Sequence, residues 1–352
     1  MKQLDTYVGK TVLSAILVVL AVLLGIDALS ALIDESEDIS KSYTFVHVLQ
    51  YVGLTIPARF YEYVPFAGLI GCLLGLGQLA SSSELVVMRA SGVSTLRLVW
   101  ASMQPALLLV VVSALIGEYL APRLEQLAES QRAVAISGHE GARTTYGLWN
   151  REGNTYMRFN AVEPGGVVHG VELYRFNPKG KLLSTLSAKR GSYQRDHWLL
   201  ENVSQAHYTS WQATSSAQTT LRWDTHLTPA LLSILVLPPQ SLSIEDLYVY
   251  SRYLEEQGLD SDDYRLALWR KLFQPVGIAS LVLVAISFVF GPLRDGSMGM
   301  RIFVGVVVGV AFRMTQDLLG PASLVYGFSP LWAVLTPIVV CALVGFLFLR
   351  RA

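Results

Sequence analysis

The sequence predicts an α-helical membrane protein with six transmembrane helices, in two groups of three, and a polar β domain inserted between the groups. Composition is the first reason: 52% of the 352 residues are hydrophobic, only 15% are charged, and the mean hydropathy is +0.42. Such a chain would be insoluble as a single globule. The second reason is the spacing of its long apolar runs, because three precede residue 120 and three follow residue 266.

Each apolar run approaches the roughly 20 residues that a helix needs to cross the hydrocarbon core. The second run is too long for one straight crossing, and it contains Pro57 and Pro65. Proline removes a backbone hydrogen bond from a helix interior, so we expect this span to be kinked or tilted. The predicted spans are 12–33, 45–79, 98–120, 268–290, 302–319 and 331–349.

The distribution of basic residues predicts the orientation, because lysine and arginine near helix ends resist translocation. With the N-terminus inside, the opposite short loops contain only Lys41. We therefore expect both termini in the cytoplasm and the polar block between the third and fourth spans outside. The cytoplasmic segments then contain eight basic residues, namely Lys2, Lys10, Arg89, Arg97, Arg294, Arg301, Arg350 and Arg351.

The polar block has the pattern of short β-strands from residue 144 onward. Turn-forming residues recur, for example at 163–166 and 177–180. Between turns, residues 155–162 alternate apolar and polar side chains, as a half-buried strand does. This spacing indicates hairpins of a β-sandwich or a jelly roll.

A linker helix is predicted to join this domain to the fourth span. Ser243 and Asp246 form a partial capping box in front of an amphipathic stretch that Gly258 ends. Both cysteines fall in predicted spans, so no disulfide is expected in the β domain. The predicted divisions are 1–122 for the first three spans, 123–242 for the β domain, 243–265 for the linker helix and 266–352 for the last three spans.

Four charged residues within the spans map to the outer half of the membrane: Arg59, Glu62, Arg313 and Asp317. A charge is costly in lipid, so it tends to face a protein interior or a polar ligand. Two interpretations remain open. The residues could form ion pairs within single helices, Arg59 with Glu62 and Arg313 with Asp317. Alternatively, they could line an outward-facing cavity for an amphiphile with charged head groups.

An acidic collar, Asp34, Glu35, Glu37 and Asp38, follows the first span. One interpretation is a solvated turn. The other is a position near a phosphorylated ligand, which would require a bridging divalent cation because like charges repel.

The sequence contains no motif that supports catalysis by this chain. Gly9, Lys10 and Thr11 resemble the end of a phosphate-binding loop, but the motif needs a glycine five residues before Gly9, and position 4 is leucine. The six histidines show no metal-ligand spacing, and no Gly-x-Ser-x-Gly motif occurs. The sequence therefore favours a non-enzymatic protein and offers no firm metal site.

The loop between the second and third spans predicts a short helix at 82–91. Serines precede it, Glu84 lies in its first turn, and a glycine ends it. Leu85, Met88 and Arg89 fall on one face. A helix of barely two turns needs support, so we expect this face to dock on the membrane surface or on another protein.

Several motifs together resemble the LptG/LptF permease family. They are the loop just described and the segments at 116–122, 291–294, 298–301, 320–321 and 324–327. The resemblance covers essentially the whole chain. It implies six transmembrane helices with a periplasmic β-jellyroll domain, in the inner membrane of a bacterium. It also implies a transport subunit that forms a heterodimer with an LptF-like permease chain.

The same resemblance implies the other components. A dimer of the ATPase LptB, which would bind ATP and Mg, is expected below the permease, and LptC is expected beside it. Driven by that ATPase, the complex would extract lipopolysaccharide from the outer leaflet and pass it to a periplasmic bridge. Membrane lipids are further expected contacts, and no nucleic acid is expected.

Coupling residues follow from the resemblance at matching positions. Glu84 matches an acidic residue of the helix that docks on the ATPase, and Leu85, Met88 and Arg89 match its neighbours. Arg132 matches a basic residue between the third span and the β domain, near the expected position of lipopolysaccharide phosphate.

Arg59 lies within one position of a basic residue near the kink of the second span in relatives. With Arg132 and Arg313 it is expected to contact lipopolysaccharide, because guanidinium groups bind phosphate in a planar, bidentate way. Asp34 and Glu37 occupy a stretch where relatives can carry lysines, so bridging Mg²⁺ or Ca²⁺ is expected there. Arg313 also departs from the family pattern, as the acidic collar does, since the resemblance implies an aromatic residue at its position.

The alternative function is a membrane-anchored periplasmic binding or sensor protein. Its β domain would recognise a ligand, and the cytoplasmic coupling helix would report the binding. Polar residues within the spans favour the permease.

Overall fold

The computed structural model describes residues 2–40, 42–137, 148–163, 165–209, 211–291 and 296–351. Lys41 and Arg294, which were used to predict the orientation, lie outside the described residues. So do most of the 291–294 motif and the predicted start of the β pattern at residue 144.

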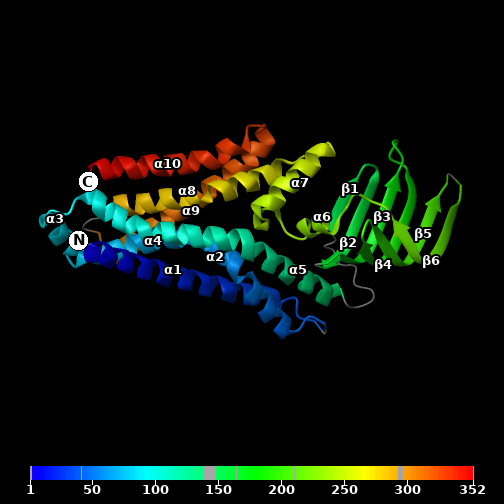
Figure 1. Cartoon of the computed structure of the whole chain (residues 1–352), viewed down its shortest axis with the longest axis horizontal. Coiled ribbons are helices and arrows are strands. Elements are labelled where there is room, and N and C mark those ends of the chain that lie inside the picture. The colour runs from blue at the N-terminus through cyan, green and yellow to red at the C-terminus, as the bar shows by residue number, and fades with distance from the viewer. Residues whose placement is uncertain are drawn as a thin grey trace.

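In the part of the chain that the structure describes, six long apolar helices form a bundle, which confirms the predicted fold class. Each is long and apolar enough to cross a membrane. Both termini and the short helix α3 (Glu84–Ala90) lie at one end of the bundle, and the β domain lies at the other (Figure 1). We call these the termini end and the β-domain end. The helices are α1 (Lys2–Ser36), α2 (Phe45–Ser81), α4 (Thr95–Leu115), α8 (Asp262–Phe290), α9 (Met298–Tyr326) and α10 (Pro330–Arg351).

Helix α2 lies at the centre of the bundle and runs unbroken through Pro57 and Pro65. It packs against α1, α8, α9 and the third span, and its second half is almost entirely buried. Helices α1 and α9 instead expose long rows of apolar side chains, such as Val22 and Ile26 on α1 and Val307 and Met314 on α9. These rows therefore face lipid or another membrane protein.

Glycines of α2 bring the backbone of α1 unusually close. A Cβ added at Gly71 would lie 2.4 Å from Cα of Ile16, and one added at Gly75 would lie 2.8 Å from Cα of Val12. Small residues at a helix interface allow such backbone contact, which gains dispersion energy that the bilayer itself does not supply. The α1–α2 pair is therefore fixed by shape.

The third span continues well beyond its predicted end near residue 120. A π-helical turn, η1 (Ile116–Leu120), leads directly into α5 (Ala121–Ser137), which was expected to belong to the β domain. Ala, Leu, Glu, Gln and Arg dominate α5, and these residues favour helix even where the chain has left the apolar layer. The extension carries Arg132 toward the β-domain end.

The β domain is one antiparallel sheet in sequential order. Its strands are β1 (Leu148–Glu152), β2 (Thr155–Glu163), β3 (Val167–Phe176), β4 (Leu182–Gln194), β5 (His197–Tyr208) and β6 (Ala213–Trp223). Short turns join neighbouring strands, as the hairpin pattern predicted, so sequence neighbours are also sheet neighbours. A complete jelly roll has two sheets, whereas the described strands form a single meander.

One face of the sheet is buried around Trp198. The Trp198 side chain is fully buried, and its indole N–H donates to the carbonyl oxygen of Leu227 at 2.8 Å. Met157 and Phe159 of β2 lie in the same cluster, in agreement with the predicted alternation. Leu232 of α6 (Pro229–Ile234) also packs there, so the chain leaving the sheet helps to close its core.

The connection back to the membrane is α7 (Ile244–Glu256), preceded by the 3₁₀ turn η2 (Pro239–Ser241). The predicted cap is confirmed, because the Ser243 hydroxyl accepts the backbone N–H of Asp246 at 3.0 Å. Helix α8 then begins at Asp262, before the predicted start of the fourth span, since charged residues can extend a helix beyond the hydrocarbon layer.

The close contact of α1 with α2 yields a stability prediction. Gly71→Ala should lower the thermal unfolding midpoint in detergent, because the new methyl group would meet the backbone of Ile16 and force the helices apart. Overpacking of this kind costs roughly 1–3 kcal/mol. Gly25→Ala on α1 is the matched control, since a Cβ there meets nothing within 4 Å. Equal midpoints for the two variants would contradict this account.

Candidate functional site

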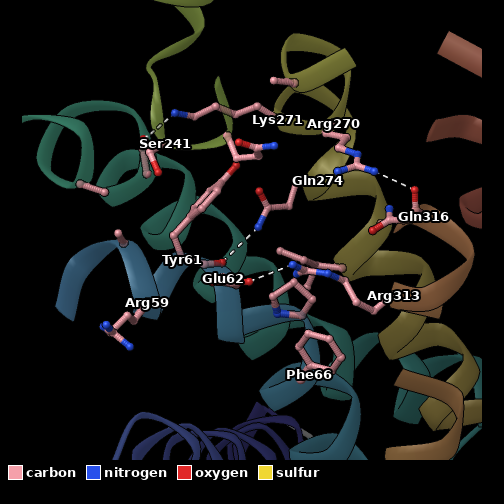
Figure 2. Close-up of a pocket in the computed structure, with 18 of the residues that line it drawn as sticks. Arg59, Tyr61, Glu62, Phe66, Ser241, Arg270, Lys271, Gln274, Arg313 and Gln316 are labelled. Carbon is pink, nitrogen blue, oxygen red and sulfur yellow. Dashed lines mark hydrogen bonds and ion pairs between the residues drawn. The ribbon is translucent and has the colours of Figure 1, made fainter. Parts of the chain in front are cut away.

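A cavity of about 390 Å³ opens in the β-domain half of the bundle, between α2, α5, α8 and α9. Its floor is apolar and includes Phe66, Ile278 and Phe312. Its upper walls carry charged and amide side chains, which Figure 2 shows around Glu62, Gln274 and Arg313. A site with an apolar base and a polar rim fits an amphiphile rather than a fully polar ligand.

The four charged residues predicted for the outer half of the membrane all line this cavity. Only one of the two ion pairs expected within single helices forms. Arg313 pairs with Asp317 of its own helix, with Nε 3.0 Å from Oδ2, and also with Glu62 of α2, with Nη2 3.0 Å from Oε1. Arg59 does not pair with Glu62. It points away from Arg313 (Figure 2). Arg59 instead forms an ion pair with Asp27 of α1.

Asp27 thus joins α1 to the cavity wall. Its carboxylate accepts from Arg59 and also from the Tyr63 hydroxyl, at 2.8 Å. Burying a carboxylate is tolerable when it is paired and hydrogen-bonded in this way. Together, the pairs centred on Arg59 and Arg313 connect α1, α2 and α9.

Two cationic residues of the cavity were missed by the sequence argument. Arg270 donates from Nη2 to the carbonyl oxygen of Gln316 at 2.7 Å and lies 3.8 Å from Asp317. Lys271 is almost completely buried, with 7% of its side chain exposed. Both lie within the predicted fourth span, so their charge inside an apolar run was the signal that could have found them.

The charges that line the cavity are balanced. Among the described residues, four cationic side chains and four carboxylates line it, so the cavity does not present a predominantly positive surface. The cationic set is Arg59, Arg270, Lys271 and Arg313, and the acidic set is Asp27, Glu62, Glu125 and Asp317.

Arg132 and the acidic collar lie together at the end of α1. The Arg132 guanidinium pairs with Glu35 at 2.9 Å and with Asp38 at 2.5 Å. Tyr43 donates its hydroxyl to Glu35 at 3.0 Å, and burial together with that carboxylate raises the pKa of Tyr43, so the hydroxyl stays protonated. Arg132 thus pairs with two of the four collar acids, and its single positive charge offsets one of their two negative charges.

The other two acids of the collar, Asp34 and Glu37, are exposed. Within the described residues, no group of three His, Cys, Asp or Glu side chains is arranged to hold a metal ion. A cation at the collar would therefore need further oxygen ligands from outside the chain, such as phosphate.

The short helix α3 forms as predicted, but the apolar face predicted to dock outward is turned into the bundle. Leu85 and Met88 are buried in the core of the bundle, with 5% and 9% of their surfaces exposed, so they are not free to dock on a partner. This face was predicted to dock on the membrane surface or on another protein, whereas the membrane helices of the same chain bury it. Val86 and Val87 are the exposed apolar residues, at 48% and 65%.

Glu84 and Arg89 lie at the two ends of α3. The Ser82 hydroxyl donates to the Glu84 carboxylate at 2.8 Å. The carboxylate is thereby held at the start of the helix, where it also suits the helix dipole.

Comparison with known proteins confirms the family resemblance over nearly the whole chain. Residues 6–351 match the family model described as "Lipopolysaccharide export system permease LptF/LptG". The lipopolysaccharide export system permease protein LptG of Escherichia coli strain K12 is 36% identical over 338 residues, 95% of this chain and 94% of that protein. LptG of Haemophilus influenzae is 35% identical over 337 residues, with 95% and 94% covered. The match includes the bundle, the β domain and α3, and it favours the permease over the sensor alternative. The chain belongs to the LptF/LptG family of lipopolysaccharide export permeases, whose members are transport subunits rather than enzymes.

Proposed function

We propose that this chain forms one half of a membrane path that takes lipopolysaccharide from the outer leaflet of the bacterial inner membrane toward a periplasmic bridge. A second, LptF-like permease chain would form the other half. An LptB ATPase dimer would supply the energy from the cytoplasm, and LptC would receive or guide the cargo. The observation that carries this proposal is the cavity with an apolar floor and a charged rim in the β-domain half of the bundle.

The orientation belongs to the same proposal. The termini end, with α3, would face the cytoplasm, and the β-domain end would face the periplasm. The excess of basic residues near the termini end supports this direction. The cavity then opens in the outer half of the membrane, at the depth where lipopolysaccharide meets the chain.

The energetics support an external motor. Removing acyl chains from the bilayer costs about 0.8 kcal/mol for each exposed methylene group. A lipid with several acyl chains cannot leave by thermal motion alone. The cavity can shelter such chains only in part, so repeated opening and closing must be driven from α3.

The exposed apolar rows of α1 and α9 support a second membrane chain. Both helices pack on α2, which lines the cavity, and a partner that covered their exposed rows would enclose the cavity within a two-chain bundle. The acyl chains would then lie between the two permeases.

Lipopolysaccharide contact can be tested by photocrosslinking in cells. A photoreactive amino acid at Arg59, Arg132 or Leu29 should give lipopolysaccharide adducts, because these positions lie along the proposed entry from α1 to the cavity. A second sample carrying Glu84→Ala should change the adduct yield, since cargo would enter without being moved on. The control position is Trp332, which is exposed on α10 away from the cavity. Absence of adducts at all three positions, in an assembled complex, would contradict the proposal.

The corrected orientation of α3 predicts which residues bind the ATPase. Val87→Asp should abolish copurification of the ATPase while leaving the unfolding midpoint unchanged, because Val87 is exposed. Leu85→Ala should do the reverse. It should lower stability by about 2–5 kcal/mol, as removal of buried methyl groups does, and it should retain the ATPase in the folded fraction. Full ATPase recovery with Val87→Asp would show that this face is not the docking surface.

We also propose that Asp34 and Glu37 approach lipopolysaccharide phosphates through Mg²⁺ or Ca²⁺, since Arg132 occupies the other two acids of the collar. The double variant Asp34→Asn, Glu37→Gln should raise the cation concentration needed for half-maximal lipopolysaccharide crosslinking at Leu29. Crosslinking without ATP is the suitable measurement, because ATP hydrolysis has its own Mg²⁺ requirement. An unchanged cation dependence would remove the collar from the binding site.

A further inference from the structure

Lys271 of α8 and Glu118 of η1 form a buried junction at the top of the cavity that the proposed function does not yet use. The Lys271 ammonium donates to the carbonyl oxygens of Gly117 at 2.7 Å and of Leu242 at 2.6 Å, and it lies 3.6 Å from Oε2 of Glu118. Gly117 belongs to the third span, and Leu242 belongs to the chain that returns from the β domain. One ammonium group thus holds three separate parts of the molecule.

The π-helical turn explains why the Gly117 carbonyl is available. In η1 the N–H of Ala121 donates to the carbonyl oxygen of Ile116, five residues back. In the same register the donor for Gly117 would be Pro122, which has no N–H. The Gly117 carbonyl therefore needs another donor in a buried site, and Lys271 supplies it. π-Helical turns of this kind often mark functional positions.

Glu118 binds the linker from the other side. Both of its carboxylate oxygens accept the backbone N–H of Ile244, the first residue of α7, at 3.0 and 3.1 Å. That N–H has no partner within its own helix, so a carboxylate from the third span completes the start of α7. The linker is consequently held at two backbone positions on either side of Ser243, the carbonyl of Leu242 and the N–H of Ile244.

The junction is also part of the cavity wall. Gly117, Lys271 and Tyr61 all line the cavity, and the Tyr61 ring fills the space beside Gly117, where a Cβ would lie 2.3 Å from the ring. The Lys271 ammonium lies 5.7 Å from the centre of the same ring (Figure 2). A shift of α2 against α8 would therefore act directly on Lys271.

Further contacts tie the linker, here the chain from α6 to the start of α7, to the membrane helices and to the sheet. Ser241 donates to Glu125 of α5 at 2.9 Å, and Leu242 and Leu247 pack with Ala267 of α8 in one apolar cluster. The other end of this linker packs through Leu232 into the core of the sheet. Movement at the junction can thus reach the sheet through a short, packed segment.

We infer that Lys271 and Glu118 are positioning residues that couple the orientation of the β domain to the width of the cavity. When the cavity closes, the outer ends of α2, α8 and the third span move, and the junction carries the linker with them. The β domain would then turn in step with each transport cycle. This inference rests on the proposed function, because it assumes that the cavity changes width during transport.

Spin labels can test the coupling in the assembled transporter. Labels at Gln218 of β6 and Ser329 between α9 and α10, both exposed, report the distance from the sheet to the bundle. The background has Cys72→Ala and Cys341→Ala. The complex of both permease chains and the ATPase is placed in vesicles with lipopolysaccharide, and the distance is measured without nucleotide and after trapping with ATP and vanadate.

The unmodified chain should show a nucleotide-dependent shift in the distance distribution. Lys271→Met should lose the shift and release lipopolysaccharide several-fold more slowly, while Lys271→Arg, which keeps a cationic donor, should retain the shift. Arg252→Met is the matched control, because Arg252 is an exposed cation of α7 with 65% of its side chain accessible. It should behave as the unmodified chain.

A folding defect is separable from loss of coupling. Lys271→Met alone leaves the Glu118 charge buried, so the double variant Lys271→Met, Glu118→Gln removes both charges together. A folded double variant without the shift supports the inference. A full shift in the double variant overturns it, as does an unmodified chain that transports without any shift. If the unmodified complex releases no lipopolysaccharide, the proposed function fails instead.

Discussion

Pairing of charged side chains between helices is the constraint on which this structure depends. A charge within a membrane bundle is costly without a partner, and here the partners lie mostly on different helices. Arg59 joins α2 to α1, Arg313 joins α9 to α2, Lys271 joins α8 to the third span, and Arg132 joins α5 to the end of α1. Each pair adds a specific polar contact to a helix crossing that is otherwise made by apolar packing.

Charged residues and close-packed glycines together form the contact between α2 and α9. Arg301, Gly305, Gly309 and Arg313 repeat every four residues and lie on one face of α9. Arg301 donates to the carbonyl oxygen of Gly77 at 2.6 Å near the termini end, and Arg313 reaches Glu62 near the β-domain end. Between them, the two glycines lie against side chains of α2. Polar contacts thus hold the α2–α9 interface at both ends, and glycines allow close packing between them. Helix α2 runs from the cavity to the end of the bundle where α3 lies.

The sequence predicted those features that depend on local pattern. Apolar run length located the spans, hairpin turns located the strands, and the Ser243 cap located α7. What it could not predict depends on which elements meet in space. Arg59 has Glu62 nearby in its own helix, yet its partner is Asp27 of another helix. Leu85 and Met88 were assigned to a docking face because the core that buries them is built from distant segments. The end of apolar character near residue 120 was mistaken for the end of the helix, although helix propensity continues through α5.

The balance of charge in the cavity bears on how a phosphorylated lipid could bind. Each cation is already engaged, so a phosphate gains a guanidinium only by displacing a carboxylate. That exchange is easiest where the pair is exposed to water, because exposed ion pairs contribute only about 0–1 kcal/mol. The Arg313–Glu62 pair is about half exposed on both sides, whereas Lys271 is almost completely buried. A head group would therefore open the Arg313 pair and leave the Lys271 junction intact. Arg313 would then bind the ligand, and Lys271 would transmit movement. Because these are different cations of the same cavity, a bound ligand would not break the Lys271 junction.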